Sequence, residues 1–148
     1  MSDHATSARR KAPVWFWILA AVATLFNVGG VMNYLVSVFN PEAATAAMTP
    51  EQAEYFLNFP AWYTANYALT THLALLGGIL LLFRRRLAFY AFVSSAVLYG
   101  VSLVYHYILN DVVQTLPAGM HLFSAVIGLQ LVGFALFSRW AAKAKLLS

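Results

Sequence analysis

The chain has 148 residues, of which 61% are hydrophobic and only 9% are charged, and its formal net charge is +4. A soluble domain carries charge on about a quarter of its residues, so this composition excludes an ordinary soluble protein and indicates a membrane protein. The absence of cysteine excludes disulfides, thiolate nucleophiles and thiol-ligated metals. The length predicts a single domain over residues 1–148.

Four apolar segments follow one another along the chain, at residues 13–39, 61–83, 87–109 and 120–140. Each is long enough to cross the hydrocarbon core of a bilayer as a helix, which takes about 20 residues. A helix is required because lipid offers the backbone no hydrogen-bond partners. The sequence therefore predicts an all-α, polytopic membrane protein built as a four-transmembrane-helix bundle. The first span also has the basic start of a signal peptide, but its apolar core of about 25 residues exceeds the roughly 7–15 that such peptides use.

The basic residues all flank spans on one predicted side of the membrane. They are Arg9, Arg10, Lys11, Arg84, Arg85, Arg86, Arg139, Lys143 and Lys145. The opposite side holds four of the five acids, which are Glu42, Glu51, Glu54 and Asp111. Because positive residues stay cytoplasmic, we expect both termini to face the cytoplasm of a bacterial inner membrane. Topology thus accounts for the basic residues, and we expect no nucleic-acid partner.

The loop between the first two spans contains a strong helix start. Thr49 can cap a helix, Pro50 suits its first position, and Gln52 can complete a capping box. The sequence predicts a short helix over residues 50–57, with two glutamates on one side and aromatic rings such as Tyr55 on the other. An amphipathic helix of this kind is expected to lie on the outer membrane interface.

The spans contain no Asp, Glu, Lys or Arg, although ion-coupled transporters usually keep one there. Neutral polar groups gather instead in the outer half of the bundle. One helical face of the third span carries Ser95, Tyr99, Ser102 and His106. We expect this face to point toward the other helices, because polar groups that face lipid leave hydrogen bonds unmade.

The candidate site residues of the outer half are Asn33, Asn66, Thr70, Tyr99, Ser102, His106 and His121. We expect Asn66 and His121 to be the neighbours of His106. In a structural interpretation these groups join the helices by hydrogen bonds worth roughly 0.6–2 kcal/mol each. Glycines would help by letting helix backbones approach, at Gly29, Gly30, Gly77, Gly78, Gly100, Gly128 and Gly133. In a functional interpretation the same groups line a vestibule that is open to the outside and suited to a neutral polar solute.

A metal site is a third interpretation. His106, Asp111 and His121 could form one at the outer face together with an acid of the first loop. No H-x-x-x-H or H-E-x-x-H spacing supports a metal site. A haem between His72 and His106 would need the two histidines at equal depth, and the rise per residue of a helix places His72 deeper in the membrane than His106. We therefore expect no metal and no cofactor. The chain also lacks a nucleophile elbow, a phosphate loop and paired carboxylates within the membrane, so we expect no enzymatic activity.

Several short motifs resemble those of a family of small bacterial four-helix membrane proteins, some of which carry the automatic label "sugar transporter". The motifs are Trp15-Phe16-Trp17, Leu25-Phe26-Asn27 with Gly29-Gly30, Pro60-Ala61-Trp62, and Gly77-Gly78 followed by Leu80-Leu81-Leu82-Phe83-Arg84. The resemblance implies a four-helix membrane fold and hints at a transport role. It transfers no binding or catalytic residue.

Two functional hypotheses follow from the sequence. In the first, the chain is a small transporter-like protein for a neutral polar solute and acts as a homo-oligomer, because four helices enclose little space. In the second, it is an accessory or assembly subunit of a larger complex and contacts other membrane subunits. In both, its immediate surroundings are the lipid bilayer.

Overall fold

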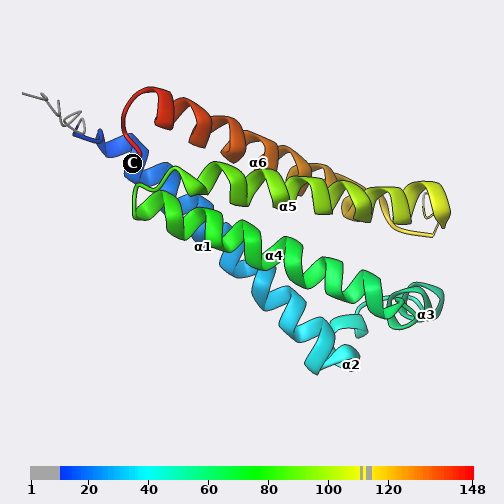
Figure 1. The fold of residues 1–148 in the computed structure, drawn as a ribbon. Coiled ribbons are helices and arrows are strands. Elements are labelled where there is room, and N and C mark those ends of the chain that lie inside the picture. Colours follow the sequence, from blue (N-terminus) through cyan, green and yellow to red (C-terminus); the bar gives the residue numbers. More distant parts are fainter. Residues whose placement is uncertain (1–10, 111, 113–114) are drawn as a thin grey trace, which may run out of the picture.

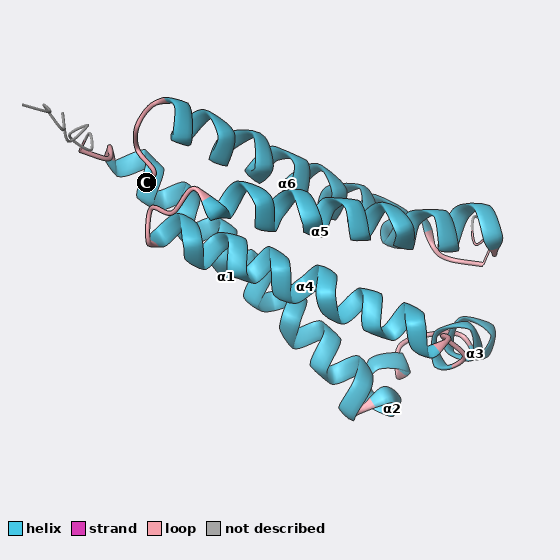
Figure 2. Ribbon diagram, in the orientation of Figure 1, coloured by secondary structure: helices cyan, strands magenta, loops and turns pink. Residues whose placement is uncertain are grey.

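The computed structural model describes residues 11–110, 112 and 115–148, and the regular structure in that part of the chain is entirely helical (Figure 2). The long helices are α1 (Val14–Phe39), α4 (Ala61–Leu82), α5 (Leu87–Val104, continued by the π-helix η1 at Tyr105–Leu109) and α6 (Ala118–Lys143). All four are long and apolar enough to cross a membrane, as in a multi-pass membrane protein. The predicted all-α fold with four spans is confirmed, and each predicted boundary lies within three residues of the observed one.

The four long helices pack in chain order, α1 on α4, α4 on α5 and α5 on α6. The first and last helices meet at one end of the bundle, where the Trp15 and Trp140 rings lie 5.2 Å apart and the Phe16 and Phe137 rings 5.7 Å apart. From there α1 and α6 diverge toward the opposite end (Figure 1). The bundle therefore has a closed end and an open end.

The buried core lies toward the closed end. Each long helix contributes a large buried side chain to it, namely Phe16, Leu81, Phe92 and Leu131. Two glycines of α4 permit this packing. A Cβ atom on Gly78 would lie 2.9 Å from the Cα atom of Thr24 in α1, and one on Gly77 would lie 2.9 Å from the Phe92 ring in α5. The expected role of glycine in close backbone approach is thus confirmed at Gly78, whereas Gly77 makes room for a ring and a Cβ atom on Gly29, Gly100 or Gly133 would meet nothing within 4 Å.

The closed end also carries the described basic residues. The turn between α4 and α5 holds Arg84 and Arg86, and it pairs with the end of the chain (Figure 1). The backbone N–H of Arg86 donates to the Ser148 carbonyl at 2.9 Å, and the N–H of Ser148 donates to the Arg84 carbonyl at 2.8 Å. Leu146 and Leu147 are thereby held in the core, with only 4% and 2% of their surface exposed. The sequence did not predict this docked tail.

The open end carries the first loop, whose described acids are Glu42, Glu51 and Glu54. The predicted separation of basic and acidic residues is confirmed for the described part of the chain, while Arg9, Arg10 and Asp111 lie outside it. We call the basic end inner and the acidic end outer. The positive-inside rule assigns the inner end to the cytoplasm, and that assignment stays a prediction.

The first outer loop forms two short helices, α2 (Pro41–Thr45) and α3 (Pro50–Leu57). The predicted helix is confirmed with the same bounds. Its capping box is complete, since the Gln52 N–H donates to Thr49 Oγ1 at 3.3 Å and the Thr49 N–H donates to Gln52 Oε1 at 3.2 Å. Figure 1 shows α3 nearly end-on beside α4, which runs across the view. That crosswise direction supports the predicted place of α3 on the membrane surface. The sequence did not predict α2.

Candidate functional site

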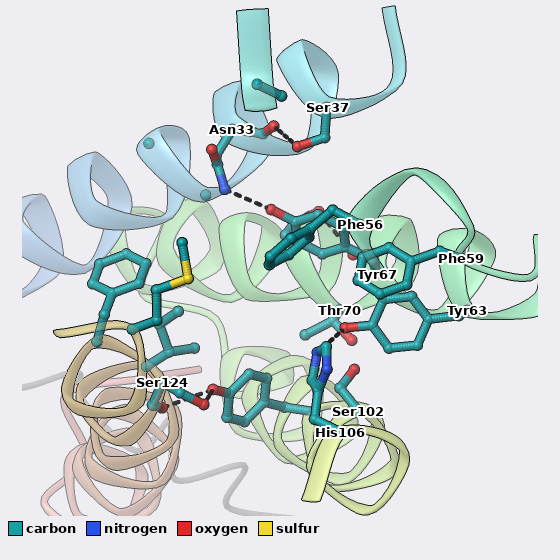
Figure 3. Close-up of a pocket in the computed structure, with 18 of the residues that line it drawn as sticks. Asn33, Ser37, Phe56, Phe59, Tyr63, Tyr67, Thr70, Ser102, His106 and Ser124 are labelled. Carbon is teal, nitrogen blue, oxygen red and sulfur yellow. Dashed lines mark hydrogen bonds between the residues drawn. The ribbon is translucent and has the colours of Figure 1, made fainter. Parts of the chain in front are cut away.

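A cavity of about 1080 Å³ occupies the outer half of the bundle, where α1 and α6 have separated. Its walls come from all four long helices, and α2, α3 and Phe59 contribute residues at its outer end. Figure 3 shows α1 on one side with Asn33 and Ser37, α4 and α5 opposite, and Ser124 of α6 on a third side. Five of the seven predicted site residues line this cavity, namely Asn33, Thr70, Tyr99, Ser102 and His106.

The other two predicted residues lie elsewhere. Asn66 is buried between α4 and α5, where its side-chain amide donates to Ser102 Oγ at 2.9 Å and to the Leu98 carbonyl at 3.0 Å. His121 lines a separate hollow between α5 and α6, with its Nδ1 atom 2.8 Å from the Tyr107 hydroxyl. The structure therefore places five of the seven predicted residues on the cavity wall and the other two outside it.

The polar face of α5 points toward the other helices, as predicted. Ser95 donates to the Thr70 carbonyl of α4 at 2.7 Å. On the other side of α5, the Tyr99 hydroxyl lies 2.6 Å from Ser124 Oγ of α6. These bonds hold both neighbours of α5, so this face fulfils the structural role that the sequence suggested for it.

His106 lies at the outer end of this face, in the π-helix η1, and joins three segments. Its Nδ1 atom is 2.6 Å from the Tyr55 hydroxyl of α3, and its Nε2 atom is 2.6 Å from the Tyr63 hydroxyl of α4 (Figure 3). A neutral imidazole has one donor and one acceptor nitrogen, so one phenol donates to the ring and the other accepts from it. Asn66 and His121, the expected neighbours of His106, make their own hydrogen bonds to other residues, and the partners of the His106 ring are these two tyrosines.

The hydrogen bond between Tyr55 and His106 holds α3 across the outer end of the bundle. Burial raises the pKa of the Tyr55 phenol, which therefore stays protonated at neutral pH. A second bond on the same helix runs from Gln52 Nε2 to the Thr115 carbonyl at 3.0 Å. The sequence predicts only that this helix lies on the outer membrane interface, and the structure adds that Tyr55, on the aromatic side, bonds His106 of the bundle.

Among the inner lining residues of the cavity is a polar pair that joins α1 to α6. Gln130 Nε2 donates to Asn27 Oδ1 at 3.3 Å, and Asn27 Nδ2 donates to the Ala23 carbonyl at 2.7 Å. The Gln130 Oε1 atom is buried and has no hydrogen-bond partner among the described residues. Both residues line the cavity, and both lie near the middle of their helices. Gln130 was not among the predicted site residues.

The upper wall of the cavity repeats this pattern of neutral hydrogen-bonding groups. Asn33 of α1 donates to the Tyr67 hydroxyl of α4 at 2.8 Å, and this bond joins the two neighbouring helices at the cavity wall (Figure 3). Among the described residues that line the cavity there is no Asp, Glu, Lys or Arg. Chemically the site can donate and accept hydrogen bonds with an uncharged ligand, and it offers no fixed charge to balance an ion.

The metal interpretation gains no support from the described residues, because no three His, Asp or Glu side chains among them are close enough to hold an ion. Asp111, a member of the proposed set, lies outside the described residues. His72 is on the exposed surface of α4, where its ring packs against Tyr34 and its Nδ1 atom is 2.7 Å from the Ala68 carbonyl. The contacts of His72 therefore differ from those of His106, which bonds Tyr55 and Tyr63.

No family model matches the chain, and no curated protein or solved structure matches it either. The resemblance to small four-helix membrane proteins therefore stays a prediction. The geometry of the cavity is therefore the basis for proposing a function.

Proposed function

We propose that the chain is a transporter-like protein of the bacterial inner membrane that takes a neutral solute with polar groups into its outer cavity. The observation that carries the proposal is the asymmetry of the bundle. The outer half holds a cavity of about 1080 Å³, and the inner half is packed shut by the aromatic contacts of Trp15 and Phe16 with α6 and by the docked tail at Leu146. Such an arrangement is that of an outward-open state.

Orientation is part of this proposal. With its basic end in the cytoplasm, the chain exposes the cavity to the outside of the cell. A cysteine at Ala46, in the first loop of a chain without natural cysteines, should react with an impermeant thiol reagent in sealed cells. If the cysteine reacts only after permeabilisation of the cells, the first loop faces the cytoplasm and the orientation is the opposite of the proposed one.

A bulky residue at Gly30 should stop solute uptake. A Cβ atom there meets only Thr71 Cγ2, at 3.9 Å, so a leucine side chain can grow into the cavity that Gly30 lines. We expect Gly30→Leu to lower saturable uptake into proteoliposomes at least about tenfold, because a filled site loses the steric fit on which binding depends. Labelled neutral polyols, sugars and monoacylglycerols would be assayed.

The matched control is Gly133→Leu. Gly133 lies on the exposed surface of α6, and a Cβ atom there has no described atom within 4 Å. This variant should transport like the unmodified chain. Absence of saturable uptake for every compound in the unmodified chain would remove the transport proposal, and equal loss in the two variants would place the solute outside the cavity.

An accessory role is the second candidate, and one observation favours it. The cavity is open between α1 and α6, so a single copy does not enclose a path through the membrane. Closing that side requires a second copy or a helix of another subunit. A homodimer in mild detergent supports the transporter, and a stable complex with an unrelated membrane protein supports the accessory subunit.

A further inference from the structure

The cavity opens toward the lipid as well as toward the outer surface. Leu25 of α1 and Phe123 of α6 both line it, and 71% and 56% of their surfaces are exposed, so neither helix covers the other at this level. Neither residue belongs to the outer loops, since Leu25 is near the middle of α1 and Phe123 is within α6. A molecule dissolved in the outer leaflet can therefore reach the cavity sideways, between α1 and α6.

Much of the lining is hydrocarbon and aromatic. In addition to the two residues at the gap, it includes Phe26, Met48, Phe56, Met120 and Ile127. A small water-soluble solute would leave these surfaces without a partner. A hydrocarbon chain would be buried against them favourably, and methionine and aromatic side chains adapt to a flexible chain.

The pair Asn27 and Gln130, in the inner part of the cavity lining, offers a specific polar contact. Asn27 Nδ2 is committed to the Ala23 carbonyl and Gln130 Nε2 to Asn27 Oδ1, which leaves the Gln130 Oε1 atom as an acceptor without a donor among the described residues. A buried acceptor without a partner is unfavourable, and a ligand that supplies an O–H or N–H group relieves it. Rotation of the Gln130 side chain toward the cavity that it lines would present this atom to the ligand.

We propose that the cavity binds a neutral amphiphile with a hydroxyl-bearing polar group, which enters from the outer leaflet between α1 and α6 and donates a hydrogen bond to Gln130. This inference rests on the proposed function and narrows its solute to a lipid-like class. The uncharged lining excludes a fixed counter-charge for a phosphate or carboxylate group among the described cavity residues. A neutral hydroxylated lipid satisfies the apolar walls and the free acceptor together.

The test uses the full chain in phosphatidylcholine nanodiscs with a photoreactive monoacylglycerol as the probe. We expect cross-links on the cavity faces of α1 and α6, and at least about a tenfold loss of them in Gly30→Leu but not in Gly133→Leu. Gln130→Leu removes the acceptor and keeps a similar volume. It should weaken competition by unlabelled monoacylglycerol about threefold to tenfold, the range for one hydrogen bond. Thermal unfolding in the nanodiscs identifies any variant that has lost its fold.

The competitors separate the outcomes. Monoacylglycerol should displace the probe, whereas glycerol and a lysophosphatidic acid at equal concentration should not. Displacement by glycerol would overturn the lipid-like class and leave a polar-solute transporter intact. Displacement by lysophosphatidic acid would overturn the requirement for a neutral group. Labelling equal in Gly30→Leu and the unmodified chain would show annular lipid only and overturn the inference. Specific labelling without any uptake would support this inference and remove transport.

Discussion

Replacing Gly78 with alanine should destabilise the bundle more than any other single methyl group added to a glycine. The new Cβ atom would lie 2.9 Å from both Cα and Oγ1 of Thr24 and 3.1 Å from its backbone nitrogen. Because Cα and N belong to the backbone of α1, they cannot move without shifting that helix. We expect a loss of about 1–3 kcal/mol in the free energy of unfolding, the usual cost of overpacking a close contact.

A glycine series measures this effect. Gly77→Ala meets the ring of Phe92 at 2.9 Å, and a side chain can yield more than a backbone, so its loss should be smaller. Gly133→Ala has no described atom within 4 Å and should be neutral, or stabilising by up to about 1 kcal/mol through helix propensity. Unfolding in mixed detergent micelles gives all three values. Equal stability of Gly78→Ala and Gly133→Ala would contradict the α1–α4 contact.

Replacing His106 with alanine should both destabilise the bundle and release α3. The hydroxyls of Tyr55 and Tyr63 each lose their bond to the ring, and each lost partner in a partly buried place costs about 1–3 kcal/mol. Tyr55 regains part of this from water once α3 moves, so we expect a total loss of about 2–4 kcal/mol. Backbone amides of residues 50–57 should exchange with deuterium faster than in the unmodified chain.

His72→Ala is the matched control. His72 lies on the exposed surface of α4 and bonds within its own helix, to the Ala68 carbonyl, so its loss should change stability by no more than about 0.5 kcal/mol. It should leave exchange at α3 unchanged. If His106→Ala and His72→Ala behave alike, the bridge from His106 to the two tyrosines contributes nothing to the fold.

Hydropathy and cap chemistry made most of the fold predictable. A membrane-spanning helix is recognised from about 20 consecutive apolar residues, and that signal does not depend on what the helix packs against. The helix Pro50–Leu57 could be predicted to the residue because Thr49 and Gln52 contact each other locally. The docked tail could not be predicted, since the carbonyls of Leu146 and Leu147 accept from Arg84 and Arg86, which are 62 and 61 positions away in the turn between α4 and α5.

The candidate site was only partly predictable for the same reason. Tyr99, Ser102 and His106 share a helical period, which a sequence reveals. Gln130 stands alone in an apolar run, and its partner Asn27 is 103 positions away, so no local pattern marks the pair. The contact of Tyr55 with His106 could not be predicted, because a sequence shows which side of a helix is aromatic and does not show whether protein or lipid covers it.

In the structure α1 and α6 are joined at the inner end and parted at the outer end, with the cavity between them. Spin labels on cysteines at Phe39 and Gly119 report the outer ends, and labels at Val14 and Lys143 report the inner ends. These positions lie at the ends of α1 and α6. Double electron–electron resonance measures both distances in the same nanodiscs.

We expect a clearly longer outer distance than inner distance in the unliganded chain, and an inner distance that monoacylglycerol leaves unchanged. An outer distance as short as the inner one, with and without monoacylglycerol, would mean that α1 and α6 pack along their whole length. The cavity, and the function proposed for it, would then be wrong.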